Sequence, residues 1–241
     1  GEIDAVALSH AHIDHCGNIP TLARSGFRGA VHATTATALL CDIMLKDSAR
    51  IQEQDAAYLN QKTNRQGEPP VIPLYTVEDA VRSLRLFKGH RYGESMELAP
   101  GARMTFVEAG HILGAALHLF ELEEAGRKAR IGFAFDLGRK NLPIIRDPDI
   151  LTGLDLLVLE STYGGRLHAD ATSADDHLCA AVKRAIGRGG KVLIPSFALE
   201  RAQEILYHLS TLVSDGRLPE LPVYVDSPMA ASVTRVFEKC H

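Results

Sequence analysis

The sequence predicts an α/β protein, and three observations support this fold class. Short apolar runs with the length of strands alternate along the chain with longer stretches that have helical spacing. Polar, Gly and Pro residues separate these segments, as at 64–70. The 241 residues include 46% hydrophobic and 23% charged residues, which suffices for a sizeable core. Regular alternation of this kind favours helices layered on sheets.

The first half of the chain begins with a strand and a long helix. Residues 3–8 are apolar and too short for a helix, so they predict a buried strand. Between 34 and 60, Leu39, Leu40, Ile43 and Met44 have the spacing of an amphipathic helix. The further elements expected in this half are a helix at 77–87 and strands at 104–108, 116–122 and 129–135.

The second half continues the alternation of strands and helices. Residues 154–159 predict another buried strand, because they form an uninterrupted apolar run. The elements expected after it are a helix at 173–186, a strand at 191–195, a helix at 200–212, a strand at 222–225 and a helix at 229–237.

Charge and cysteine content limit the partners and the compartment. A net charge of -4 is mildly acidic, so total charge gives no argument for a polyanion as partner. The four cysteines are scattered and form no CxxC pair, which suits reduced thiols. No apolar run approaches the roughly 20 residues that span a bilayer. We therefore expect a cytoplasmic protein that is not inserted in a membrane.

Ligand-type side chains gather directly after the first predicted strand. The run HAHIDH contains His10, His12, Asp14 and His15. Imidazole suits Zn²⁺, and a carboxylate beside the histidines makes room for a second ion. A lone histidine is usually a surface or satisfied core residue, but four ligand types in six positions favour a metal site. Cys16 follows the run and is more typical of a small packed residue.

Two later residues could complete such a site. His111 stands in AGHILGAA, among small residues that permit close approach, and Asp136 follows the predicted strand at 129–135. Each alone would more often satisfy backbone or solvent. Together with the HAHIDH run they predict a metal centre built from three segments of the chain.

These motifs carry a resemblance to a known family. HAHIDH, AGHILGAA and FDLGR, in this order, resemble the metallo-β-lactamase superfamily, and ESTYG, KVLIPSFALERAQEILYHL and PVYVDSPMAASVTRVFEK resemble its β-CASP subfamily of RNA-processing nucleases. The resemblance implies an incomplete αββα sandwich over 1–164, followed over 165–241 by the start of an inserted α/β β-CASP domain. It also implies two zinc ions as cofactors.

The resemblance assigns roles to individual residues. His10, His12 and His111 would hold one zinc, Asp14 and His15 the second, and Asp136 would bridge both. Glu160 would orient a histidine that protonates the leaving oxygen. His168 follows the same motif and is a weaker candidate for direct catalysis.

The family's proton-donating histidine and a final zinc-binding histidine are expected beyond residue 241. The chain begins with Gly1 rather than Met and enters a predicted strand at once. We therefore expect it to be a piece of a longer protein.

The function implied is hydrolysis of RNA phosphodiester bonds by a hydroxide shared between two zinc ions. Alternatives are a dinuclear zinc hydrolase of thioesters or lactams and a catalytically silent RNA-binding subunit. RNA is the expected partner, and a homo-oligomer is left open. A basic surface could contact phosphates, although such charges more often form a solvated helical face; its members are Lys46, Arg50, Arg82, Arg85, Lys88, His90 and Arg91.

Overall fold

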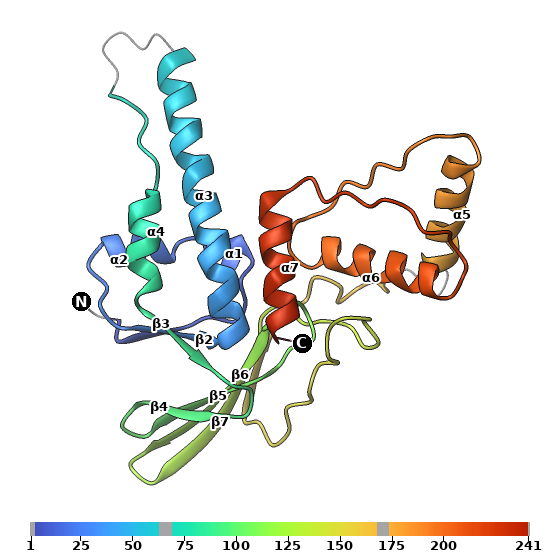
Figure 1. Ribbon diagram of the computed structural model, residues 1–241. Coiled ribbons are helices and arrows are strands. Elements are labelled where there is room, and N and C mark those ends of the chain that lie inside the picture. The colour runs from blue at the N-terminus through green and yellow to red at the C-terminus, as the bar shows by residue number, and fades with distance from the viewer. Residues whose placement is uncertain (1–2, 63–68, 168–173, 241) are drawn as a thin grey trace.

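The computed structural model describes residues 3–62, 69–167 and 174–240, and it contains two β-sheets with helices around them (Figure 1). The first sheet is parallel, with the order β1-β2-β3. The second has the order β4-β5-β6-β7-β8 and is antiparallel except for the parallel pair β7 and β8. The strands are β1 (Ala5–Ala7), β2 (Ala30–Thr34), β3 (Phe87–His90), β4 (Ser95–Ala99), β5 (Ala102–Glu108), β6 (Ala116–Glu124), β7 (Arg127–Ala134) and β8 (Leu156–Leu159).

The helices divide between the first sheet and the C-terminal part of the chain (Figure 1). The helix α3 packs against β2, β3, α1, α4 and α7, whereas α5 contacts α6. The helices are α1 (Ile13–Cys16), α2 (Ile19–Arg24), α3 (Thr35–Lys62), α4 (Val77–Leu84), α5 (Ala174–Ile186), α6 (Arg201–Ser214) and α7 (Pro228–Cys240).

The local sequences of α3 and α4 favour helix formation. The helix α3 contains neither Gly nor Pro, and its buried residues Leu40, Cys41, Leu45 and Ala49 form one stripe. The helix α4 begins with a capping box: Thr76 Oγ1 accepts from the backbone N–H of Asp79 at 3.2 Å, and an Asp79 carboxylate oxygen accepts from the N–H of Thr76 at 3.0 Å.

The main core lies against α3, and a smaller one joins the two sheets. Val31 and Ala33 of β2 are fully buried in the main core, which Val233 and Phe237 of α7 also enter. In the smaller core, Phe106 of the second sheet packs with residues that include Ala7 of the first. The C-terminal segment thus packs against the main core through α7.

Most predicted elements are confirmed, including the mixed α/β class and the long helix, which runs over Thr35–Lys62. The structure also contains β2, β3, β4, α1 and α2, which the sequence patterns did not predict because they are short or lack regular alternation.

Three of the predicted strands need correction. Residues 154–159 were expected to be buried, but all four residues of β8 are exposed. Among the described strands, β8 pairs with β7 alone and so lies at the end of the sheet. Residues 191–195 and 222–225 form no strand and are exposed. An apolar run becomes a strand only when a partner strand satisfies its backbone, and none of the described strands pairs with these two runs.

The buried stripe of α3 should stabilise the packing of this helix against the first sheet. Leu45 is fully buried and Leu39 in the same helix is 41% exposed. We expect Leu45→Ala to lower the free energy of unfolding by about 2–5 kcal/mol, because it leaves a cavity in the core. The matched change Leu39→Ala should cost less than about 1 kcal/mol. Urea unfolding followed by circular dichroism checks this, and equal losses in the two variants would contradict it.

Candidate metal centre

The ligand-type residues follow strands that end at one edge of the second sheet. Since β5 and β7 both run antiparallel to β6, and β8 runs parallel to β7, these three strands end at the same edge. His111 follows β5, Asp136 follows β7 and Glu160 follows β8. The backbone N–H of Ala116, where β6 begins, donates to the carbonyl of Ser9 at 2.8 Å. This bond brings the loop after β1 to the same edge.

Four side chains converge there. His12 Nδ1 lies 3.1 Å from His10 Nε2 and 3.2 Å from His111 Nε2. Asp136 Oδ2 lies 3.5 Å from His10 Nε2 and 3.4 Å from His111 Nε2. The ligand atoms of these four residues all lie within 4.8 Å of one another. Three imidazole nitrogens and a carboxylate oxygen facing one centre match the donor set of a divalent metal.

The remaining two residues of the HAHIDH run lie on α1, beside this group. His15 Nε2 is 3.5 Å from the same Asp136 Oδ2 and 3.5 Å from Asp14 Oδ2. Asp136 is thus a neighbour of His15 as well as of His10 and His111. Asp14, with its side chain 75% exposed, stands outside the group of four converging residues.

The histidines are held in the neutral form that binds metals. Burial, with the neighbouring histidines, lowers the pKa of His10 to about 2. Burial also lowers the pKa of His12 and of His111. The Ser9 hydroxyl lies 3.0 Å from His10 Nδ1, so the other ring nitrogen faces the centre. Because a metal ion is bound by neutral imidazole, the burial of these three rings favours metal binding.

Glu160 joins two segments at the edge of the site. One of its carboxylate oxygens accepts from the backbone N–H of Leu137 at 3.0 Å, and the other accepts from that of Thr162 at 3.2 Å. These hydrogen bonds lower the pKa of its carboxyl group. Glu160 thereby holds the residue that follows Asp136. His168 lies outside the described residues, so its catalytic role stays a prediction.

Two side chains near the site were missed by the sequence patterns. His118 of β6 is buried between the sheets, 5.1 Å and 5.3 Å in ring centroid distance from Phe106 and Phe135. Glu108, the last residue of β5, is also buried. The available signal was a polar residue at an inward position of each alternating strand.

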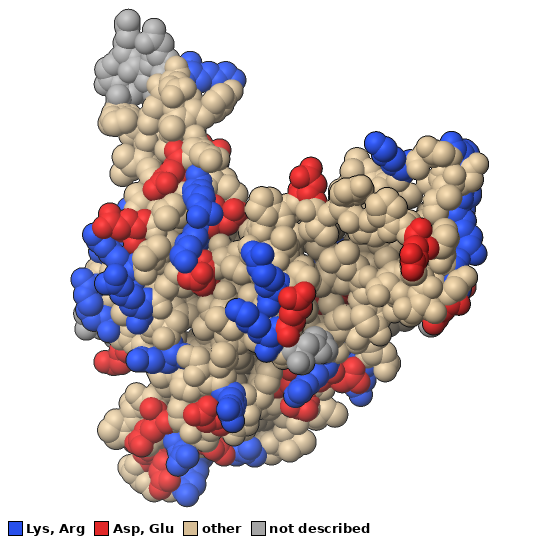
Figure 2. Space-filling model, in the orientation of Figure 1, with Lys and Arg blue, Asp and Glu red and all other residues tan. Residues whose placement is uncertain are grey.

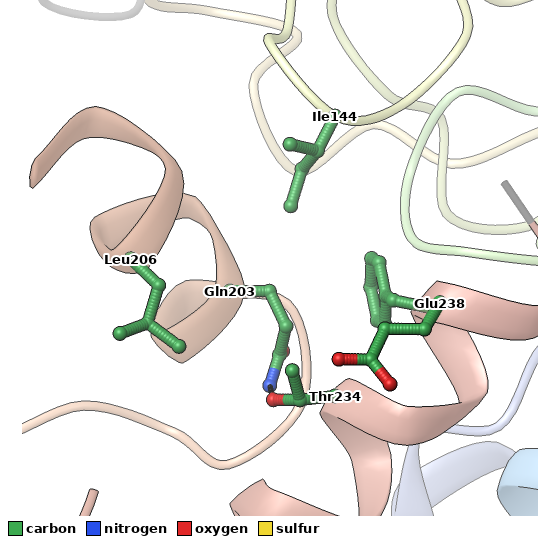
Figure 3. A pocket seen from close by; sticks show the side chains of 6 residues that line it. Ile144, Gln203, Leu206, Thr234 and Glu238 are labelled. Atoms are coloured by element: carbon green, nitrogen blue, oxygen red, sulfur yellow. Dashed lines mark hydrogen bonds between the residues drawn. The ribbon is translucent and has the colours of Figure 1, made fainter. Parts of the chain in front are cut away.

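The cavities lie elsewhere. A cavity of about 220 Å³ lies between α6, α7 and the loop that contains Ile144. Figure 3 shows the side chains that line it. Its lining residues are Ile144, Gln203, Leu206, Thr234, Phe237 and Glu238. None of the converging ligands lines it, so the metal centre is a separate site.

The candidate basic surface is partly neutralised. Arg82 pairs with Glu78, and Lys46 with Asp42 at 2.6 Å. On the face shown in Figure 2, Lys and Arg are interspersed with Asp and Glu. Contacts to phosphate from this surface stay a prediction.

Comparison with known proteins gives two family matches. Residues 1–95 match the model of the metallo-beta-lactamase superfamily, and residues 202–241 match that of the Beta-Casp domain. These matches confirm the resemblance predicted from the motifs. No helix within the described residues is long and apolar enough to cross a membrane.

Named relatives align with almost the whole chain. Ribonuclease TTHA0252 of Thermus thermophilus is 36% identical over 238 residues, which are 99% of this chain and 49% of the relative. Transcription termination factor FttA of Pyrococcus horikoshii is 35% identical, over 94% of this chain and 33% of its own. Cleavage and polyadenylation specificity factor 73 of Drosophila melanogaster is 32% identical, over 98% of this chain and 32% of its own.

The chain thus spans about half the length of the first of these relatives and a third of the other two. The expectation that the chain is a piece of a longer protein stays a prediction.

The buried His118 should make stability depend on pH. Burial lowers its pKa to about 4 from 6.5. Below pH 6.5 the unfolded chain therefore binds a proton that the folded protein does not, and the free energy of unfolding falls as the pH drops toward 4. The full loss is about 3 kcal/mol. His118→Phe, which suits the aromatic surroundings, should remove this share. Urea unfolding at pH 7 and pH 4.5 measures it, and the same pH dependence in both proteins would contradict the assignment.

Proposed function

The chain belongs to the metallo-β-lactamase superfamily, with a Beta-Casp segment near its C-terminus, and from this membership we propose that it hydrolyses RNA phosphodiester bonds with two zinc ions. The observation that carries the proposal is the convergence of His10, His12, His111 and Asp136 from three segments of the chain. The names of its relatives, which include ribonuclease and endoribonuclease, support RNA as the substrate class.

Each proposed ligand has a chemical reason. His10, His12 and His111 would hold the first zinc, since their neutral rings face one centre. His15 and Asp14 would hold the second. Asp136 would be shared by both ions, which its Oδ2 supports by lying about equally far from His10, His15 and His111. When bound, two zinc ions would lower the pKa of water toward neutrality and neutralise charge on phosphate oxygens.

Other residues of the chain would orient the ligand Asp136 and help to protonate the leaving oxygen. Glu160 fixes the backbone of Leu137 and so the direction in which Asp136 points. Its carboxylate, with a lowered pKa, is ionised at neutral pH and suited to orient a histidine. His168 remains a proposed catalytic group in the same segment. Proton delivery to the leaving oxygen by such groups is typically worth about 10²–10⁴-fold in rate.

The alternatives use the same donor set. Hydrolysis of lactams or thioesters needs the same metals, but the Beta-Casp match and the ribonuclease relatives favour RNA. A catalytically silent RNA-binding subunit is disfavoured by the intact donor set.

Residence in the cytoplasm is part of the proposal, because all four cysteines are free and reduced thiols persist there. Self-association is a further proposal, which light scattering of the purified protein tests.

The first test is metal content. We expect two zinc ions per chain, because six imidazole and carboxylate side chains leave coordination positions open for water. Elemental analysis of gently purified protein, before and after chelation and zinc addition, measures this. A metal content near zero that added zinc does not restore would refute the proposal.

The second test separates chemistry from folding. Asp136→Ala should reduce cleavage of a labelled RNA to background, because it removes the carboxylate shared by both proposed zinc sites. The fold should persist, since Asp136 follows a strand end and its side chain is 35% exposed. Circular dichroism on the same preparation checks this. The control Asp55→Ala, at an exposed position of α3, should cleave like the unaltered protein. Unchanged cleavage by Asp136→Ala would contradict the bridging role.

A further inference from the structure

A buried carboxylate holds the loop that carries His111. Glu108 ends β5 and is 8% exposed. Its Oε1 accepts a hydrogen bond from the backbone N–H of Gly110 at 2.9 Å. Gly110 immediately precedes His111 and has a positive φ of 64°, a conformation that suits glycine. The bond therefore fixes the backbone next to the proposed ligand.

Tyr92 holds the other end of the same loop. Its hydroxyl donates to the carbonyl of Ala115 at 2.9 Å, and that carbonyl also accepts from the N–H of Ala109 at 3.1 Å. Burial, together with the nearby Glu108 carboxylate, raises the pKa of Tyr92. Two neighbouring side chains thus brace both ends of the turn between β5 and β6.

The segment after Asp136 rests on this braced turn. The N–H of Gly138 donates to the carbonyl of Ala109 at 2.9 Å. A Cβ atom at Gly138 would lie 1.5 Å from the carbonyl oxygen of Gly110, so only glycine fits there. His111 and Asp136 therefore share one support, and a shift of the turn changes the distance between them.

Stability alone gives no reason for an acid at position 108. Met104 and Phe106, the other buried residues of β5 on this face, are apolar. Burial raises the pKa of Glu108, while the hydrogen bond from the Gly110 N–H and the charge of Arg146 oppose that effect. A buried carboxyl group is costly unless it is well paired, and here its pairing is with the backbone of the turn. The acid is explained by the acceptor that it offers to the turn.

We propose that Glu108 and Tyr92 are positioning residues of the metal centre, which set the place of His111 relative to Asp136. Neither side chain is among the ligands; both act through the backbone of the turn. This inference rests on the proposed metal site. Side chains that orient metal ligands typically change metal affinity about 10–100-fold when they are removed.

Cobalt binding to the metal-free protein tests the positioning role. Co²⁺ occupies zinc sites, and its visible absorption reports ligand geometry as well as affinity. Glu108→Gln keeps an acceptor oxygen, whereas Glu108→Met removes it at similar size. We expect Glu108→Met to bind Co²⁺ at least ~10-fold more weakly, with an altered spectrum at full occupancy. Glu108→Gln should restore both towards those of the unaltered protein.

Co²⁺ binding to Tyr92→Phe is a second test of the positioning role. Its control is Tyr58→Phe, on the exposed surface of α3. Weaker Co²⁺ binding by Tyr92→Phe alone supports the proposal. Circular dichroism melting identifies a temperature at which every variant is folded. If Glu108→Met does not fold, Tyr92→Phe decides, and unchanged binding and spectrum in that variant overturn the positioning role.

The outcomes separate the two proposals. Normal Co²⁺ binding and spectrum in folded Glu108→Met overturn the positioning role and leave the metal centre standing. An unaltered protein that binds no Co²⁺ refutes the proposed metal centre, and the positioning role with it.

Discussion

The metal centre depends on the hydrogen bond between the N–H of Ala116 and the carbonyl of Ser9, because it joins the two sheets where the ligands meet. Ala116 begins β6, and Ser9 directly precedes His10. The bond acts together with the apolar contacts of Ala7 and Phe106, which also join the two sheets. The small side chains of Ala115 and Ala116, both nearly fully buried, allow the loop to approach so closely. Strand direction then brings His111 and Asp136 to the same edge.

The centre is assembled at a cost to stability. Burial lowers the pKa of His10 to about 2 and of His118 to about 4, so neither ring gains the solvation that a charged imidazole would have in water. Burial also raises the pKa of Glu108. Polar groups are gathered here although apolar side chains would pack more favourably. Such a concentration is typical of functional sites, where local rules of folding are violated for chemistry.

The local patterns in the sequence predicted the longer helices well, but they missed α1 and α2 and predicted the C-terminal strands poorly. The helix α3 satisfies its backbone within one segment and has one buried stripe, so spacing alone identified it. Residues 191–195 and 222–225 are apolar runs of the length of a strand, but they form no strand. A strand needs partners that are remote in sequence, and apolarity gives no information on whether a partner is present. For the same reason the exposure of β8 could not be predicted from its apolar residues.

The sequence by itself determined the types of ligand, their order along the chain and the family to which they point, because HAHIDH, AGHILGAA and FDLGR are local motifs. Only the tertiary structure decided which side chains meet: His12 lies 3.2 Å from His111 across 99 positions of sequence, whereas Asp14 stands apart from the converging four. It also decided that Glu108 supports the turn before His111. These distances depend on strand pairing and on the contact between the sheets, which no local pattern contains.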